Sequence, residues 1–385
     1  MRRRGFSLSD NQPTVWSADP HTIAKHRILQ ASLGAWLPIL SRQSKNVGSA
    51  EKSIKYIDGF AGPGVYEGGE KGSPVLALET ALNHAHEFPV PVDLVFIESN
   101  KQRFDKLSQQ LSHYTSQVAL SKNIGNVTPI HGNCREIIDE MLKAAKDGQR
   151  RFGPALVFLD QFGYSAVPMD LIGRILAQSQ CEVLTFFFWR ELERFITDES
   201  KHTGITTAFG GTEWQPAITM DARECRRFMH DTYIKCLKDR AKAKYVWPFA
   251  MADANSRLLC WLFFCTNSLR GLEEMKDAMC KVDKTGGFCF SDEHGLNQLS
   301  LLATYSPDRL EADMQKALAG RTMSVLEIKE WVLTETPAHL FKTPLGNLER
   351  QGIAKPINPP SERRPCSYPD EQMGMLMKFE YLALF

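Results

Sequence analysis

Five short apolar segments, separated by segments with helical periodicity, dominate residues 53–189. The predicted strands are SIKYIDGF, VDLVFIES, NVTPIHG, PALVFLDQFG and CEVLTFFFW. The predicted helices between them are SPVLALETALNHA, NKQRFDKLSQQL, NCREIIDEMLKAA and PMDLIGRILAQ, the first with Ser73 at its N-cap and Pro74 at its first helical position. Because parallel strands are joined by crossovers of about this length, the alternation predicts a parallel sheet with helices on both faces.

A different pattern follows the fifth predicted strand. A helical stretch covers about 190–242, and YVWPFAMAD and SRLLCWLFFCTNS then follow with only a few residues between them. Two strands this close together must pair as an antiparallel hairpin. Five α/β strands closed by such a hairpin are the element order of class I methyltransferases. The predicted fold class is therefore α/β and Rossmann-like, with a seven-stranded, mostly parallel sheet, although many doubly wound folds share the first half of this order.

The C-terminal part has its own pattern. Three short helices are predicted in SPDRLEADMQKALAG, SVLEIKEWVLTET and FKTPLGNLERQGI, followed by strands in AKPIN and MGMLMKFEYL. Three helices followed by a two-stranded wing predict a winged-helix-like module, and a helical appendage packed on the main domain is the alternative. The predicted organisation is an N-terminal helical segment at 1–48, a methyltransferase-like α/β domain at 49–300 and the C-terminal module at 305–385.

The composition is ordinary for a soluble globular protein, with 43% hydrophobic and 24% charged residues. The formal net charge is +1, so the chain as a whole does not indicate a nucleic-acid or membrane partner, and either would need a local patch. The apolar segment 258–269 is too short to cross a bilayer, and the basic N-terminus lacks the apolar run of a secretory signal. The nine cysteines form no CxxC pair, which favours a cytoplasmic protein.

A glycine-rich loop follows the first predicted strand. In DGFAGPG, Asp58 ends the strand, and Gly62 and Gly64 allow a tight turn and a close approach of a ligand to the backbone. The loop matches neither the P-loop nor the dinucleotide fingerprint, so a ligand without phosphates is favoured over a pyrophosphate. A glycine loop without a ligand is the alternative. The next segment, VYEGGEKG, is either a lid over the ligand or a solvated detour.

Polar residues also end the other predicted strands. Glu98 can accept hydrogen bonds from both hydroxyls of a ribose, or it is a solvated neighbour of the next helix. Asn133 can read an adenine edge, or it caps the following helix. Asp160 ends the fourth strand. Because the carboxyl ends of parallel strands meet at one edge of a sheet, three carboxylates and the glycine loop are expected to converge there.

These motifs resemble a known family. The segments YIDGFAGPGVYEGGEKGSPVLALE, VFLDQFGY, GTEW and GLEEMKDAM are similar to the three-Cys-motif partner proteins (TcmP), over roughly residues 20–355. The resemblance implies a fold similar to S-adenosylmethionine-dependent methyltransferases, S-adenosylmethionine as cofactor, and a three-Cys-motif protein as partner. It also implies roles in cofactor binding: the methionine part would lie among Asp58, Gly62 and Gly64, the ribose on Glu98, and the adenine near Phe60 and Asn133.

The resemblance also implies a place for the reaction. Asp160 stands where amino-methyltransferases carry an acid or amide followed by two prolines and an aromatic residue, but this chain has DQFG there. The predicted roles are hydrogen bonding to the target amine for Asp160, hydrogen bonding to the target edge for Gln161, and stacking for Phe162.

Further residues are predicted to lie near the reacting centre. Tyr164 is also predicted on the substrate side of the rim. Arg190 and Arg194 either line that side or form a solvated helix face. No metal site is predicted, because His84 and His86 point to different faces of a helix.

Three functions follow as hypotheses. The first is a methyltransferase that uses S-adenosylmethionine to methylate an amine, with a nucleobase of DNA or RNA as one candidate. The second is a catalytically inactive scaffold that serves a three-Cys-motif protein. The third is a nucleic-acid-binding regulator that acts through residues 305–385, where the loop SERRP carries a net positive charge.

Overall fold

The computed structural model describes residues 20–46, 53–149, 151–161, 166–252, 258–282, 289–291, 305–357, 359–370 and 373–380. The first part of the chain, through Ser291, contains the helices α1 (Pro20–Asn46), α2 (Ser73–Leu82), α3 (Lys101–Ser112), α4 (Thr115–Leu120), α5 (Cys134–Lys146), α6 (Met169–Leu176), α7 (Trp189–Phe195), α8 (His202–Phe209), α9 (Ala222–Asp239) and α10 (Leu269–Val282). Short 3₁₀ helices lie at Glu199–Lys201 and Gln215–Thr219. The strands of this part are β1 (Ile54–Asp58), β2 (Val92–Glu98), β3 (Ile124–His131), β4 (Ala155–Leu159), β5 (Cys181–Phe187), β6 (Tyr245–Ala252), β7 (Leu258–Thr266) and β8 (Cys289–Ser291).

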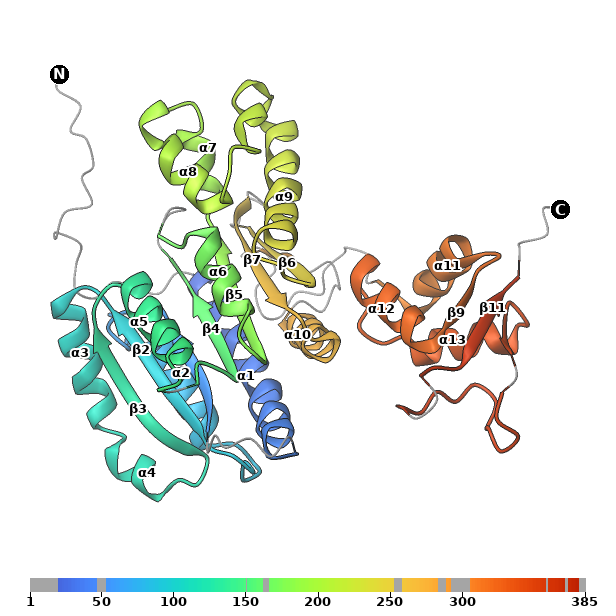
Figure 1. Ribbon diagram of the computed structural model, residues 1–385, viewed down its shortest axis with the longest axis horizontal. Helices are drawn as coiled ribbons and strands as arrows, with labels where there is room; N and C mark the ends of the chain where they lie inside the picture. The colour runs from blue at the N-terminus through green and yellow to red at the C-terminus, as the bar shows by residue number, and fades with distance from the viewer. Residues whose placement is uncertain are drawn as a thin grey trace.

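The described strands of this part form one sheet in the order β3-β2-β1-β4-β5-β7-β6-β8 (Figure 1). Strands β1 to β5 are parallel, while β7 is antiparallel to both β5 and β6. The predicted α/β, Rossmann-like, mostly parallel sheet with a closing hairpin is thus confirmed. The sheet is one strand wider than predicted, because the three-residue β8 adds to β6 at its edge. A strand this short leaves almost no periodicity to recognise in a sequence.

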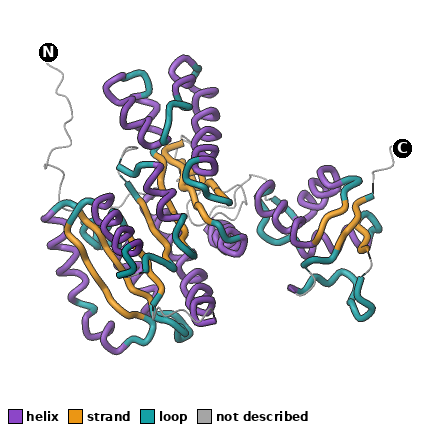
Figure 2. Tube along the Cα trace, viewed as in Figure 1, coloured by secondary structure: helices purple, strands orange, loops and turns teal. Residues whose placement is uncertain are grey.

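Both faces of the sheet are buried. Alternate residues of each central strand enter two separate apolar cores, as Ile57 and Val157 do on one face and Tyr56 and Leu156 on the other. Helices α5, α6, α8 and α9 cover the first face, and α1, α2, α3 and α10 cover the second (Figure 2). This two-sided burial explains why the strands are continuous apolar runs in the sequence.

One local prediction was wrong. Helix α2 begins at Ser73, so its N-cap is Gly72 and not Ser73. The hydroxyl of Ser73 makes no cap; it donates to Oδ2 of Asp58 at 2.5 Å instead. A tertiary partner therefore replaced the local hydrogen bond that the sequence favours at this position.

The C-terminal unit has a core of its own. Its elements are α11 (Pro307–Leu318), β9 (Thr322–Ser324), α12 (Val325–Glu335), α13 (Lys342–Arg350), β10 (Ala354–Ile357) and β11 (Leu376–Phe379). The strands form an antiparallel sheet in the order β10-β11-β9, and the helices bury Met314, Ile328 and Leu345 against it. The three predicted helices and two predicted strands are present, with β9 in addition. The assignment to the winged-helix class stays a prediction.

A buried lysine joins this unit to the α/β sheet. Lys276 of α10 is 0% exposed, and its Nζ lies 3.7 Å from the centroid of the Trp247 ring. The same Nζ donates to the carbonyls of Leu333 and Thr336, at 2.9 and 2.6 Å, which are among the last carbonyls of α12. Burial lowers the pKa of Lys276 to about 6. An ion pair between Lys329 and Glu273 extends the contact.

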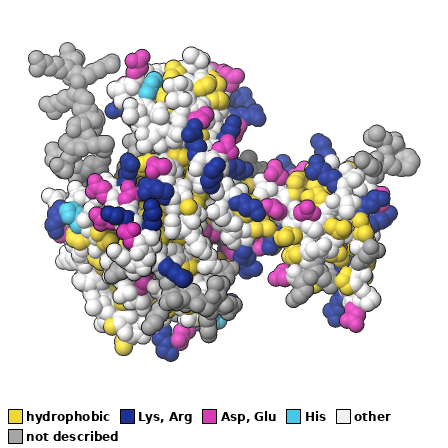
Figure 3. All heavy atoms as spheres, in the orientation of Figure 1, with side chains coloured by type: hydrophobic (Ala, Val, Ile, Leu, Met, Phe, Trp, Pro, Cys, Tyr) yellow, Lys and Arg dark blue, Asp and Glu magenta, His cyan; other side chains and the backbone are white. Residues whose placement is uncertain are grey.

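The surface carries charges of both signs. Lysine and arginine side chains intermingle with aspartate and glutamate on the face shown in Figure 3, as the formal net charge of +1 leads one to expect. Within the described part of the chain, no helix combines the length and the apolar character needed to cross a membrane.

Candidate functional site

The carboxyl ends of β1, β2 and β4 meet at one edge of the sheet. Asp58 is the Cα partner of Phe96 in β2 and of Phe158 in β4, so Glu98 and Asp160 each lie two residues beyond a neighbour of Asp58. The chain order reverses between β1 and β4, and ligands of open α/β sheets bind at such a switch point. The three carboxylates predicted to converge are therefore brought together, and we call this edge the rim.

The loop after β1 is pinned to both neighbouring strands. The amide of Gly59 donates to the carbonyl of Phe158 at 2.9 Å, and the amide of Ala61 donates to the carbonyl of Ile97 at 2.9 Å. The amide of Gly62 donates to Oε2 of Glu98 at 2.8 Å. Main-chain bonds to β4 and β2 thus fix the path of the loop across the switch point.

Two glycines of this loop have left-handed backbone conformations. Gly62 has φ +65° and Gly64 has φ +82°, a region that residues with a Cβ rarely adopt. A Cβ on Gly62 would meet no atom within 4 Å, so the space beside it is open. A Cβ on Gly64 would lie 3.2 Å from a methyl of Leu107, so that glycine also serves the packing of α3.

Asp58 supports the loop from behind. Its side chain is 0% exposed and accepts hydrogen bonds from the hydroxyl of Ser73 and, at 3.1 Å, from the amide of Phe60. Burial raises the pKa of Asp58 to about 7; the two hydrogen bonds oppose this, and the charges of Asp160 and Glu98 add to it. The prediction that Asp58 lines the ligand is corrected, because its carboxyl faces the loop and the start of α2.

Glu98 is buried and connects two loops. Its Oε2 accepts from Gly62, and its Oε1 accepts from the amide of Asn100 at 2.7 Å. An ionised carboxylate offers about four lone-pair positions, so two remain for further donors such as ribose hydroxyls. Glu98 can therefore hold the glycine loop and bind a ligand at the same time.

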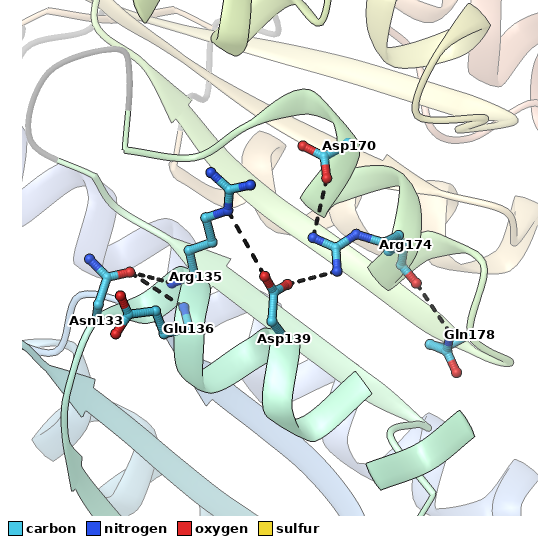
Figure 4. Close-up of polar contacts among 7 residues, drawn as sticks. All are labelled: Asn133, Arg135, Glu136, Asp139, Asp170, Arg174 and Gln178. Carbon is cyan, nitrogen blue, oxygen red and sulfur yellow. Dashed lines mark hydrogen bonds and ion pairs between the residues drawn. The ribbon is translucent and has the colours of Figure 1, made fainter. Parts of the chain in front are cut away.

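Asn133 caps α5, as one of its two predicted interpretations stated. Its exposed side chain accepts from the amides of Arg135 and Glu136, at 2.9 and 3.4 Å (Figure 4). Farther along the same helix, Asp139 pairs with Arg174 of α6 at 2.7 Å, which ties α5 to the next helix. The cap uses the side-chain carbonyl oxygen of Asn133. The side-chain NH2 group is the part that would hydrogen-bond to a base under the other interpretation.

The remaining predicted residues of the cofactor side and the fourth strand differ in exposure. Phe60 is half-buried and packs against the core cluster on the α5 side of the sheet. Asp160 is half-buried directly after β4. Phe162 and Tyr164 lie outside the described residues.

Gln161 does not serve the role predicted for it. Its side chain is 1% exposed, its Nε2 donates to the carbonyl of Phe186 at 3.2 Å, and its Oε1 accepts from the amide of Val167 at 2.8 Å. Both ends of the amide are therefore bonded to the backbone. The prediction that Gln161 recognises a target edge is corrected: it ties the chain after β4 to β5.

Arg190 and Arg194 are both exposed on α7, which begins just after the end of β5. Their neighbour Trp189 is 0% exposed and its ring packs 5.8 Å from that of Trp261. The arginines thus lie on the outer face of a helix whose inner face is core, and their role stays a prediction.

Sequence reasoning missed two supports of the rim. Ser73 was interpreted as a cap, although it bonds Asp58, and only the tertiary fold reveals that partner. Gly59 is required for space, because a Cβ there would lie 2.5 Å from Sγ of Cys134. Burial raises the pKa of Cys134 to about 12, so this thiol stays neutral and is no nucleophile.

The described residues contain no cluster of histidine, cysteine, aspartate and glutamate that could hold a metal ion.

Comparison with known proteins adds little to this site. No protein-family model matches the sequence, and no curated protein matches it. Among solved structures, the chain is similar to the complex of Trm1 from Pyrococcus horikoshii with S-adenosyl-L-methionine, at 10% identity and a TM-score of 0.32. The match covers 69% of this chain and 61% of that one, less than two thirds of its length. At this TM-score the similarity carries no argument, and the fold assignment rests on the strand order.

Proposed function

We propose that the protein binds S-adenosylmethionine at the rim and transfers its methyl group to an amine. The observation that carries the proposal is the glycine loop at the switch point, pinned by Glu98 through the amide of Gly62. This loop has open space beside Gly62 and no phosphate-binding motif. A nucleoside without phosphates is the ligand class that these features suit.

The charges at the rim support the same cofactor. Glu98 and Asp160 place two carboxyls at the rim beside the glycine loop, and a sulfonium is a cation. When bound, S-adenosylmethionine supplies an electrophilic methyl group. Glu98 would hold the ribose with its free lone pairs, and Phe60 and the amide of Asn133 would lie on the adenine side.

The acceptor follows from the half-buried acid after β4. Asp160 would accept a hydrogen bond from the target N–H, which keeps the nitrogen lone pair directed at the methyl group, and orientation would supply much of the rate. An amine is therefore the proposed acceptor, and a nucleobase of DNA or RNA is one candidate.

The experiment is a transfer assay with methyl-labelled cofactor and purified protein, offered total RNA, DNA and cell protein separately. We expect label in one of the three. Asp160→Ala should abolish incorporation while S-adenosylhomocysteine still binds, and Asp105→Ala, an exposed acid of α3, should change neither. Absence of S-adenosylhomocysteine binding by the unchanged protein would overturn the proposal.

A second candidate function is a non-catalytic partner of a three-Cys-motif protein. It is favoured by the acceptor side, where Gln161 is bound to the backbone and no proline pair follows Asp160. The C-terminal unit also exposes Leu326 and Leu376, at 46% and 43%, which a partner could cover. Cofactor binding without incorporation into any of the three pools would select this candidate.

The C-terminal unit is proposed to be winged-helix-like. The order α11, β9, α12, α13, β10 and β11, with a three-stranded antiparallel sheet, supports that assignment. Nucleic-acid binding by this unit is the third hypothesis, and salt-dependent retention of DNA or RNA by the full chain would support it.

A further inference from the structure

A cavity lies at the edge of the large sheet opposite the rim. Its volume is about 220 Å³, and it is lined by α1, the first residues of β5 and the turn from β7 into α10. Cys181 and Glu182 begin the parallel strand β5, and Thr266 ends the antiparallel β7, so all three lie at the edge away from Asp58. The cavity is thus separate from the proposed cofactor site.

A buried carboxylate lines this cavity. Glu182 is 6% exposed, and its Oε2 accepts from the indole nitrogen of Trp36 at 2.6 Å. Its Oε1 accepts from the hydroxyl of Thr266 at 2.7 Å. The backbone of α10 approaches so closely that a Cβ on Gly271 would lie 1.9 Å from Oε1. Residues of α1, β7 and α10 therefore fix the carboxylate in one position.

This carboxylate has no cationic partner in the described part of the chain. Its two donors, Trp36 and Thr266, are neutral, and the guanidinium of Arg270, which also lines the cavity, pairs with Glu274 at 2.7 Å. Burial raises the pKa of Glu182 to about 7, against the effect of both hydrogen bonds. A buried carboxyl without a cation is ordinarily neutralised by such a pKa shift, so near neutral pH this group is divided between its protonated and ionised forms, and a bound cation would hold it ionised.

The wall of the cavity that α1 supplies is largely apolar. Trp36, Ile39 and Leu40 of α1 supply it, and they are buried or half-buried. A pocket with a hydrocarbon wall and a few fixed polar groups is the usual form of a small-molecule site. Glu182 is the buried acid of this lining, and its ionised form disfavours an anionic ligand and is stabilised by a cationic one, whereas a neutral ligand gains no charge interaction.

We propose that this cavity is a second ligand site, which binds a small organic cation: a primary ammonium or guanidinium group on a short hydrocarbon body. The head group would pair with Glu182, and the hydrocarbon would pack on Ile39 and Leu40. The proposal does not depend on the function of the rim.

The test is calorimetric titration of the full-length protein with n-butylguanidinium and n-butylammonium, and with 1-butanol and butyrate as neutral and anionic controls of similar size. We expect saturable binding of at least one cation and binding at least 10-fold weaker for both controls. Glu182→Gln should weaken the cation at least 10-fold. Asp105→Asn, at an exposed acid of α3 that is not part of the cavity lining, should change it less than 2-fold.

A second variant keeps the test decisive if Glu182→Gln fails to fold. Ile39→Trp would fill the cavity from α1 while keeping Glu182 in the chain, and it should also abolish cation binding. The proposal is overturned if neither cation binds, if 1-butanol binds as tightly as the cations, or if Ile39→Trp leaves cation binding unchanged. The same holds if a folded Glu182→Gln protein binds the cations as tightly as the unchanged protein.

Discussion

The rim has a cofactor half and an acceptor half, and the residues predicted for the two halves differ in their hydrogen-bond partners. In the cofactor half, formed by residues 58–64, Glu98 and Asn133, each polar side chain accepts from backbone amides of the rim loops or of the helix it caps. In the acceptor half, which comprises Asp160, Gln161, Arg190 and Arg194 among the described residues, Gln161 is bonded to backbone away from open space, and Arg190 and Arg194 are exposed on α7.

The difference indicates which part of the proposed reaction would be fixed in advance by this fold. Backbone amides that hold Asp58 and Glu98 shape the cofactor half before any ligand arrives, which reduces the cost of ordering it on binding. Among the described residues predicted for the acceptor half, Asp160 is half-buried, and its role at the reacting centre stays a prediction. Cofactor binding is accordingly the better supported step, and the variants below separate the two halves.

The largest effect is expected from Gly62→Val. A branched side chain at φ +65° strains the backbone and fills the open space of the cofactor half, so S-adenosylhomocysteine affinity should fall about 100-fold in calorimetry. Gly69→Val is the matched control, because Gly69 has φ +87° and equally open surroundings but lies exposed in the next segment, VYEGGEKG. Equal losses of affinity in both variants would show that backbone strain alone, and not the filling of the space beside Gly62, is responsible.

Gln161→Ala probes the acceptor half. It leaves the amide of Val167 and the carbonyl of Phe186 without their buried partner, so the free energy of unfolding should fall by about 2 kcal/mol. Denaturant unfolding measures this. Cofactor affinity should change less than 3-fold. A stable variant that loses only transfer activity would restore Gln161 as a substrate contact.

Asp58→Asn should change how stability depends on pH. Because the folded-state pKa of Asp58 is about 7 and the ordinary value is 3.8, the folded protein holds this proton more tightly, and the stability it contributes is lost as pH rises through 7. The free energy of unfolding of the variant should therefore fall between pH 5 and pH 8 by about 2 to 3 kcal/mol less than that of the unchanged protein. If the pH profiles of the variant and the unchanged protein ran parallel, the raised pKa of Asp58 would be contradicted. Asp105→Asn, at an exposed site, is the control.

The smallest effects are expected from Arg190→Ala and Arg194→Ala. Both side chains are exposed, so stability should change by less than about 0.5 kcal/mol and cofactor affinity by less than 2-fold. A rise in the KM for the methyl acceptor with an unchanged cofactor affinity would place them on the substrate side. No change in KM would assign them to a solvated helix face.

The sequence was sufficient for the features that depend on pattern. The apolar runs predicted β1 to β7, and the position of Asp58, Glu98 and Asp160 at strand ends predicted that they converge. These predictions succeed because burial on both faces leaves a strong signal and because parallel strands share one carboxyl edge.

The remaining features depend on contacts between distant segments. Lys276 reads as a solvated lysine of an amphipathic helix, yet it is buried under Trp247 and bonds carbonyls about 60 residues away. Glu182 lies in an apolar run, where nothing local indicates a cavity or its partner Trp36. Side-chain partners across such separations are set by packing, which a single sequence does not encode in its periodicity.

The most direct test of the central claim is calorimetric titration of the unchanged protein with S-adenosylhomocysteine, with ATP titrated in parallel. The glycine loop without a phosphate motif predicts saturable one-to-one binding of S-adenosylhomocysteine and at least 10-fold weaker binding of ATP. No binding of S-adenosylhomocysteine, or ATP binding of equal strength, would contradict the assignment of the rim.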